Sequence, residues 1–259
     1  MKKYHFFLSS DDEILADEHL ARNEWPQAGV CLSRIPNPNV RVLNKYGTLL
    51  REHLNDLPGA LKVYQQALTK ATPRQKAETN LNIGLVYNNM KEHEKAFQAF
   101  SQALKFFESE KKQDLPLIAR CLVGLGNAQW RCHKLDEALG FAERALAIRE
   151  HEIKPRNDFD VAACLGNIGN ILHDQGDNQR ALSYAVRAVD LLNTCGQGDP
   201  RYAGALNNLG AMYQVNGNLV KAREYFQRAV NSLPDENHAH RKSALANIAR
   251  LDAAEKSQK

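Results

Sequence analysis

The sequence of 259 residues predicts an all-α solenoid of about six helix hairpins, followed by a C-terminal capping helix. Three observations lead to this prediction: a recurring Leu-x-x-(Leu/Ile)-Gly pattern, a pair of alanines at fixed distances after each pattern glycine, and prolines outside the expected helix interiors. A unit that returns over most of a chain at steady spacing is typical of stacked repeats, each of which buries its apolar face against the next.

The repeat is defined by a glycine and two alanines. The pattern glycines are Gly84, Gly126, Gly169 and Gly210, with Gly47 a looser fifth copy. An alanine follows the first four of these by twelve residues and a second alanine comes seven residues later, as Ala96 and Ala103, Ala138 and Ala145, Ala181 and Ala188, and Ala222 and Ala229. Earlier copies of the first alanine are Ala60 and Ala28, so that successive units are 32, 36, 42, 43 and 41 residues apart.

Each unit is expected to be two helices joined by a polar turn such as residues 91–93. The second helix of that unit carries an amphipathic stripe of Ala96, Phe97, Phe100, Ala103 and Leu104. Small residues allow two helices to cross closely, where a larger side chain would overpack at a cost of roughly 1–3 kcal/mol. Gly176 and Gly217 fall in turns, as expected where a helix ends with positive φ.

Proline positions support the division into units. Pro26 and Pro58 fall in the first turn of a second helix, where the missing N–H costs nothing. The remaining seven prolines fall between units, and a proline inside a helix would cost about 3 kcal/mol. We therefore expect a degenerate helix pair in residues 1–38, a solenoid in 39–234 with repeats near 39–73, 74–115, 116–158, 159–199 and 200–234, and a capping helix with a tail in 235–259.

The pattern resembles the tetratricopeptide repeat (TPR) over roughly residues 12–234. The longer period of ~42 residues, the Asn-(Leu/Ile)-Gly core and the Asp-x-x-x-Ala-x-x-Leu lead-in at Asp158 and Asp199 are similar to kinesin light chains. The segment 125–128 is similar to Pins-like spindle-orientation adaptors. The resemblance implies a right-handed superhelix whose concave wall consists mainly of first helices.

The resemblance also implies which residues face the groove. Asparagine recurs there, as Asn82, Asn167, Asn208 and Asn247 two residues before the pattern position and as Asn127 and Asn170 one residue after it. Asparagine is unfavourable inside a helix because its side chain competes for backbone hydrogen bonds. Its amide can donate to and accept from an extended main chain, which is how the similar families use it. The alternative is that these amides bond to neighbouring repeats and touch no ligand.

Four further residues are groove candidates on the same grounds: Arg120, Trp130, Arg131 and His173, with Asp174 beside the last. The two arginines could pair with carboxylates and the tryptophan could anchor a ligand. The alternative is solvated arginines and a tryptophan that packs on an adjoining helix. The lysine-asparagine clamp of chaperone-binding TPR proteins is not matched.

Several classes of function are not indicated. The chain has no zinc-protease, phosphate-loop or nucleophile-elbow motif, so we expect no catalytic residue, no metal site and no cofactor. No apolar run approaches the ~18–20 residues of a membrane span, and residues 1–8 are too short for a secretory signal. The five cysteines are odd in number and lack a CxxC pair, which indicates reduced thiols in the cytoplasm. Cys121 and Cys164 are expected to be buried.

The sequence therefore predicts a non-enzymatic cytoplasmic scaffold or adaptor that binds an extended peptide segment of a protein partner, with an acidic segment as one option. We expect a monomer or weak homo-oligomer with no membrane partner. An alternative is a regulatory or self-assembly module whose groove is filled by its own chain or by another copy. RNA binding is disfavoured because charges are mixed and the net charge is only +4.

Overall fold

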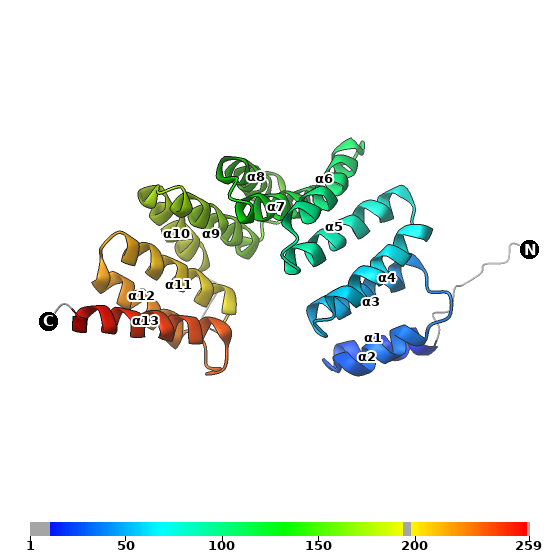
Figure 1. Cartoon of the computed structure of the whole chain (residues 1–259), viewed down its shortest axis with the longest axis horizontal. Coiled ribbons are helices and arrows are strands. Elements are labelled where there is room, and N and C mark those ends of the chain that lie inside the picture. Colours follow the sequence, from blue (N-terminus) through cyan, green and yellow to red (C-terminus); the bar gives the residue numbers. More distant parts are fainter. Residues whose placement is uncertain (1–10, 194–197, 258–259) are drawn as a thin grey trace, which may run out of the picture. The chain divides into compact units, whose positions relative to one another are not determined.

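The computed structural model describes residues 11–193 and 198–257, and within them it contains thirteen α-helices, one π-helical turn and no strand (Figure 1). The helices are α1 (Asp11–Ala21), α2 (Trp25–Arg34), α3 (Val40–Glu52), α4 (Leu57–Lys70), α5 (Pro73–Asn89), α6 (His93–Ser109), α7 (Leu115–Arg131), α8 (Leu135–Ala147), α9 (Asp158–Asp174), α10 (Asn178–Leu192), α11 (Pro200–Val215), α12 (Leu219–Asn231) and α13 (Ala239–Ser257). They form six hairpins and a final helix, which confirms the predicted fold class.

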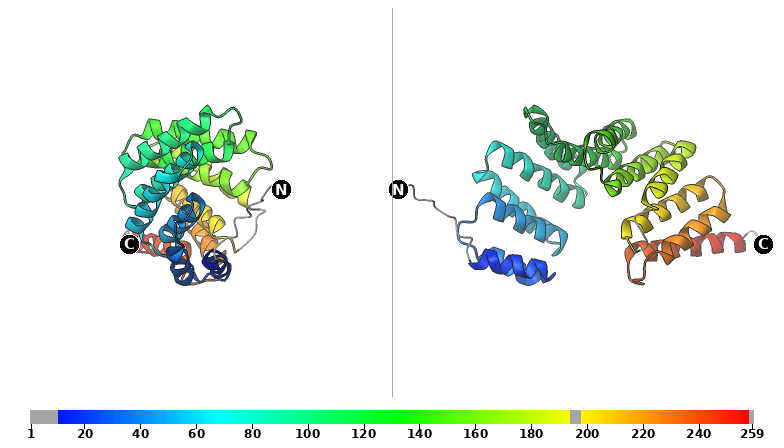
Figure 2. Two further views of the ribbon diagram at one scale, coloured as in Figure 1. Left: turned by 90° about the vertical axis from the view of Figure 1, so that its right-hand side faces the viewer. Right: turned by 180° about the vertical axis from the view of Figure 1, so that it is seen from behind.

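The chain divides into two compact units, residues 1–114 and 115–259. Helices α1 to α6 make three hairpins in the first unit, and α7 to α13 make three hairpins and the final helix in the second. Within each unit, the two helices of a hairpin pack against each other and against the next hairpin (Figures 1 and 2). In the second unit, α13 packs on both α11 and α12, the position expected of a capping helix.

The pattern glycines lie where the two helices of a hairpin cross. In three hairpins an aromatic ring of the second helix covers the glycine. A Cβ atom built on the glycine would lie 2.6 Å from the ring in the pair Gly47–Tyr64, and 2.7 Å from it in Gly84–Phe100 and Gly210–Phe226. At Gly126 and Gly169 the nearest atoms are backbone oxygens of Ala138 and Ala181, at 3.3 and 3.4 Å. The predicted steric role of these glycines is confirmed, because none of the first three positions has room for a methyl group.

All six hairpin turns contain a residue with positive φ. The predicted turn glycines adopt it, Gly176 with φ of 85° and Gly217 with φ of 78°. The other four turns use Asn23, Asn55, Lys91 and His133, with φ between 52° and 63°. The left-handed conformation therefore belongs to the repeat itself, since non-glycine residues adopt it where the same turn must close.

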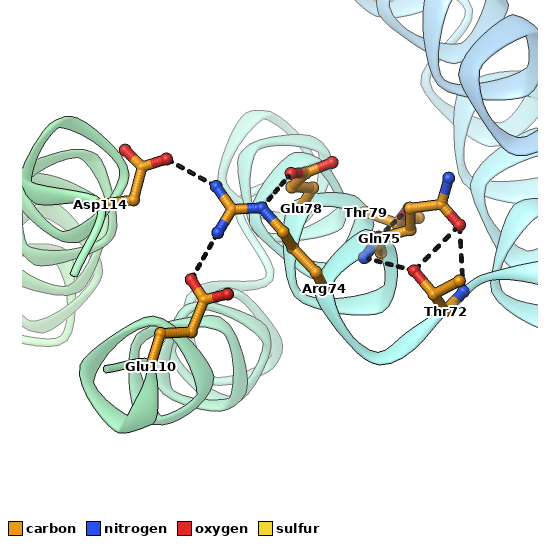
Figure 3. Close-up of polar contacts among 7 residues, drawn as sticks. All are labelled: Thr72, Arg74, Gln75, Glu78, Thr79, Glu110 and Asp114. Atoms are coloured by element: carbon orange, nitrogen blue, oxygen red, sulfur yellow. Dashed lines mark hydrogen bonds and ion pairs between the residues drawn. The ribbon is translucent and has the colours of Figure 1, made fainter. Parts of the chain in front are cut away.

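Polar contacts define the start of α5. The Thr72 side chain accepts a hydrogen bond from the Gln75 backbone N–H, and the Gln75 side chain accepts one from the Thr72 backbone N–H. These reciprocal bonds form a capping box on a helix whose first residue is proline. One residue further, the guanidinium of Arg74 binds Glu78, Glu110 and Asp114 (Figure 3).

This cluster ties the first turn of α5 to the segment after α6. The Arg74 Nη2 atom lies 2.6 Å from Asp114 Oδ2, and Nη1 donates to Glu110. Hydrogen bonds to Glu110 and Asp114 raise the pKa of Arg74 above its ordinary value. Residues 110–114 belong to the linker that follows α6. Through Glu110 and Asp114, this linker is bound to α5, the first helix of the same repeat.

Cysteine burial agrees with the sequence. Cys31, Cys121 and Cys164 are buried and Cys132 is half-buried, all as free thiols, while Cys195 lies outside the described residues. Burial raises the pKa of the Cys164 thiol, although Arg149 opposes that shift. A buried thiol with a raised pKa is a packing residue and a poor nucleophile.

Candidate functional site

A hollow of about 240 Å³ lies in the second unit, between α9, α10 and α11, with a contribution from the start of α13. Its walls carry small residues: Ala162, Ala163 and Gly166 on α9, and Gly204 and Ala205 on α11. Because these positions have short side chains or none, the two helices leave open space where longer side chains would meet.

Three of the predicted groove asparagines line this hollow. Asn167 and Asn170 come from α9, and Asn208 comes from α11. All three are half-buried, and their side-chain amides make no hydrogen bond to any described residue of the protein. The Asn208 Nδ2 atom lies 3.8 Å from the position of a Cβ on Gly166, so this amide lies across the face of α9. The structure thus gathers three amides with open donors and acceptors around one space.

The floor of the hollow is apolar. Ala185, Ala188 and Leu192 of α10 are buried beneath it, together with Met212 of α11. Asparagine amides at the wall and hydrocarbon at the floor make an amphipathic site. Such a lining is typical of sites that hold a ligand through a few polar groups and a larger apolar contact.

One side of the hollow carries an aromatic ring and a cation. The Arg201 guanidinium lies 3.4 Å from the centroid of the Phe159 ring. Asp199 orients it, because Arg201 Nε and Nη2 donate to its two carboxylate oxygens at 3.0 and 2.7 Å. The hydrogen bonds from Arg201 hold the pKa of the Asp199 carboxyl below its ordinary value. Arg201 is therefore held at the edge of the site as one half of an ion pair with Asp199.

His240, in the first turn of α13, completes the lining. A Cβ built on Gly204 would lie 3.3 Å from His240 Cε1, so the imidazole packs on the bare backbone of α11. Burial lowers the pKa of His240, and the neighbouring His238 lowers it further. The final helix thus covers the last hairpin and also contributes a side chain to the hollow.

The candidates around Trp130 form a separate polar cluster. The Trp130 Nε1 atom donates to Asp174 Oδ2 at 2.6 Å, which joins the ends of α7 and α9. The guanidinium of Arg131 lies 4.6 Å from the Trp130 ring centroid, and His173 Nδ1 is 2.8 Å from Asn178 Oδ1. Trp130 and His173 are half-buried and already bonded, and neither lines the hollow.

The remaining predicted residues are dispersed. Arg120 is exposed on α7, while Asn127 is half-buried on the same helix. Asn82 is half-buried on α5, in the first unit. The Asn247 amide donates to Asn207 Oδ1 at 3.0 Å and accepts from Arg250 at 3.2 Å, which is the inter-helix contact weighed above as the alternative.

Sequence reasoning missed Phe159, Arg201 and His240 as lining residues. The side chain of His240 is exposed, and one part of its ring packs on Gly204. The hollow itself could have been predicted from two small residues, Ala163 and Gly166, which lie six and three positions before Gly169. The matching positions before Gly84 carry Glu78 and Leu81.

Other chemistry receives no support from the described residues. Residues 11–193 and 198–257 contain no cluster of three or more His, Cys, Asp or Glu side chains arranged to hold a metal ion. Within that same part of the chain, no helix has the length and apolar character needed to cross a membrane. The neighbouring Cys132 and His133 lie at a hairpin turn, where His133 has positive φ.

The hairpin architecture and the pattern glycines define an α-helical repeat protein. Models of the tetratricopeptide repeat match residues 75–151 and 167–237, which together make up more than half of the chain. The chain therefore belongs to the tetratricopeptide-repeat family, as the sequence pattern predicted.

Individual relatives are distant. The chain is 26% identical over 157 residues to KINESIN LIGHT CHAIN-RELATED 1 of Arabidopsis thaliana, across 61% of this chain and 26% of that protein. It is 28% identical over 221 residues to the human protein O-mannosyl-transferase TMTC1, across 74% of this chain and 23% of that one. The chain thus spans about a quarter of the length of each of these relatives.

A solved structure supports the fold. BtubC (BKLC) from P. vanneervenii superposes with a TM-score of 0.62 at 19% identity, covering 80% of this chain and 84% of that one. Similarity at this level of identity concerns the arrangement of helices and carries no information on ligands.

Proposed function

We propose that this chain is a non-enzymatic interaction scaffold that binds an extended peptide segment of a protein partner in the hollow of its second unit. Membership of the TPR family supports the general role, a protein–protein interaction module. The observation that carries the specific role is the gathering of Asn167, Asn170 and Asn208 around one space, with amides not bonded to any described residue.

Extended main chain is the ligand that suits these amides. Each amide can donate to a carbonyl and accept from an N–H, and a main chain in extended conformation presents both groups along its edge. Each such bond contributes about 0.5–1.5 kcal/mol net. Since the three asparagines come from two neighbouring first helices, they can contact successive residues of one segment.

The charge of the lining favours an acidic segment. Arg201 is the one permanently charged residue of the lining, and no carboxylate belongs to the lining within the described part of the chain. A carboxylate beside Arg201 would gain a charge-assisted contact while sharing the guanidinium with Asp199. We propose a cytoplasmic site of action from the cysteine usage, and a monomer or weak homo-oligomer as the acting form.

Affinity capture with matched variants tests this function. The tagged chain, its Asn167→Ala/Asn208→Ala variant and the control variant Asn89→Ala/Asn231→Ala are each used as bait in cytosolic extract. The control asparagines are exposed and lie outside the hollow. We expect proteins retained by the wild type and the control to be lost from the first variant, with helicity unchanged in all three.

Equal retention by all three baits would contradict the assignment of the groove. In the alternative, the groove is filled by the protein's own chain or by another copy, and the bait would then retain no other protein. Removal of residues 1–38 would then change the oligomeric state measured by light scattering. That outcome would contradict the proposed capture of a foreign segment.

A further inference from the structure

The hollow owes its depth to side chains that this pair of repeats lacks. Six residues before the pattern glycine, α9 and α11 carry Ala163 and Gly204, whereas α5 and α7 carry Glu78 and Arg120. Three residues before it, α9 carries Gly166, where α5 and α7 carry Leu81 and Val123. Main-chain binding by asparagines needs no such depth, so the space is available for something besides the main chain.

The space is large enough for a side chain. A cavity of about 150 Å³ lined by hydrocarbon accepts a benzene molecule. The hollow measures about 240 Å³, and Ala185, Ala188 and Leu192 form an apolar floor. An apolar side chain the size of leucine or phenylalanine therefore fits, and its burial would remove hydrocarbon from water on both partners.

The described lining offers no carboxylate to a basic side chain. Arg201 is already paired with Asp199, His240 offers an imidazole whose pKa is lowered, and no carboxylate belongs to the lining among the described residues. A lysine or arginine side chain entering the hollow would lose its hydration without gaining a partner of opposite charge.

We propose that the hollow is a specificity subsite that accepts one bulky, uncharged apolar side chain from the bound segment. The inference rests on the proposed function, because it assumes that the asparagines hold the main chain from which that side chain projects. Its class of partner is an extended segment with a leucine, methionine or phenylalanine at the position between the two asparagines of α9 and the one asparagine of α11. The start of α13, through His240, forms one wall of the subsite.

Capped single residues can test the subsite without knowledge of the partner. The full chain, labelled with ¹⁵N, is titrated with N-acetyl-leucinamide, N-acetyl-glycinamide and N-acetyl-lysinamide, and the signals of the Asn167, Asn170 and Asn208 side-chain amides are followed by NMR. We expect the leucine probe to bind roughly ten- to hundredfold more tightly than the glycine probe, as burial of a leucine side chain implies. The lysine probe should bind no more tightly than the glycine probe.

Two filling variants and one control separate the subsite from the main-chain contacts. Ala163→Leu and Ala205→Leu place hydrocarbon in the hollow, and either serves if the other does not fold. Ala147→Leu makes the same change at an exposed position of α8 outside the hollow. We expect the preference for the leucine probe to vanish in a filling variant and to persist in the control.

The outcomes distinguish this inference from the proposed function. If the glycine and leucine probes shift the asparagine signals with equal affinity, the subsite is wrong while main-chain binding stands. If the leucine preference persists in a folded filling variant, or if no probe moves these signals, the subsite is also wrong. A third outcome would support the subsite and contradict the role of the asparagines. In that outcome, the filling variants lose the preference for the leucine probe, while Asn167→Ala/Asn208→Ala still captures the partner.

Discussion

Substitution of Gly84 by alanine tests the close packing of a glycine on an aromatic ring that three of the hairpins share. Alanine is favoured over glycine in a helix by about 1 kcal/mol, so propensity alone predicts a gain in stability. The added Cβ would lie 2.7 Å from two atoms of the fully buried Phe100 ring, which cannot rotate away without displacing its neighbours. Overpacking of a core costs about 1–3 kcal/mol. The net expectation is a loss of up to about 2 kcal/mol, against a gain where the Cβ meets nothing.

The matched control is Gly140→Ala. Gly140 is exposed on α8, and a Cβ built there meets no atom within 4 Å. This variant should gain up to about 1 kcal/mol. Urea unfolding followed by far-ultraviolet circular dichroism compares the two, and Gly84→Ala should cost less in a Phe100→Leu background, where the ring is absent. If both glycine variants shift the unfolding curve in the same direction by the same amount, the steric reasoning is refuted.

Two further predictions concern charged groups. Arg74→Gln should lower the urea midpoint, because Glu110 and Asp114 lose the cation that binds them, and this loss should be smaller in high salt because salt screens the carboxylates. The control is Lys105→Gln, which changes an exposed residue of α6. A loss of midpoint that does not depend on salt would contradict the electrostatic account. For His240, the folded-state pKa lies below the unfolded value of 6.5, so the unfolded chain binds the proton more readily and stability is lost as pH falls through 6.5. His240→Gln should therefore show a smaller loss of urea midpoint on acidification than the wild type or the exposed His151→Gln, and equal losses in all three would contradict it.

The hairpins could be predicted from sequence because their signals are local and repeated. The glycine and alanine spacings place the helix crossings, and Gly176 and Gly217 reveal two of the turns. The turn at Lys91 is predicted as a polar stretch only, and neither it nor the turn at His133 contains a glycine. A lysine or histidine adopts positive φ only because two packed helices require the chain to reverse there.

The candidate site was predictable in part. The family resemblance and the recurring register of asparagine predict six groove asparagines, of which Asn167, Asn170 and Asn208 line one hollow. The hollow itself depends on residues far apart in sequence, since Phe159 and Arg201 meet across two helices and His240 arrives from a third. A pattern of residue types along the sequence cannot predict these contacts, because the contacts depend on how neighbouring repeats pack.

The most direct test of the account is the affinity of this chain for the segment it captures. Isothermal titration of that segment, prepared as a capped peptide, is carried out on the wild type, Asn167→Ala/Asn208→Ala and the control Asn89→Ala/Asn231→Ala. Loss of two main-chain hydrogen bonds at about 0.5–1.5 kcal/mol each predicts a dissociation constant weakened roughly 5- to 150-fold in the first variant and unchanged in the control. A dissociation constant that is the same for all three proteins would contradict the claim that these amides hold the ligand.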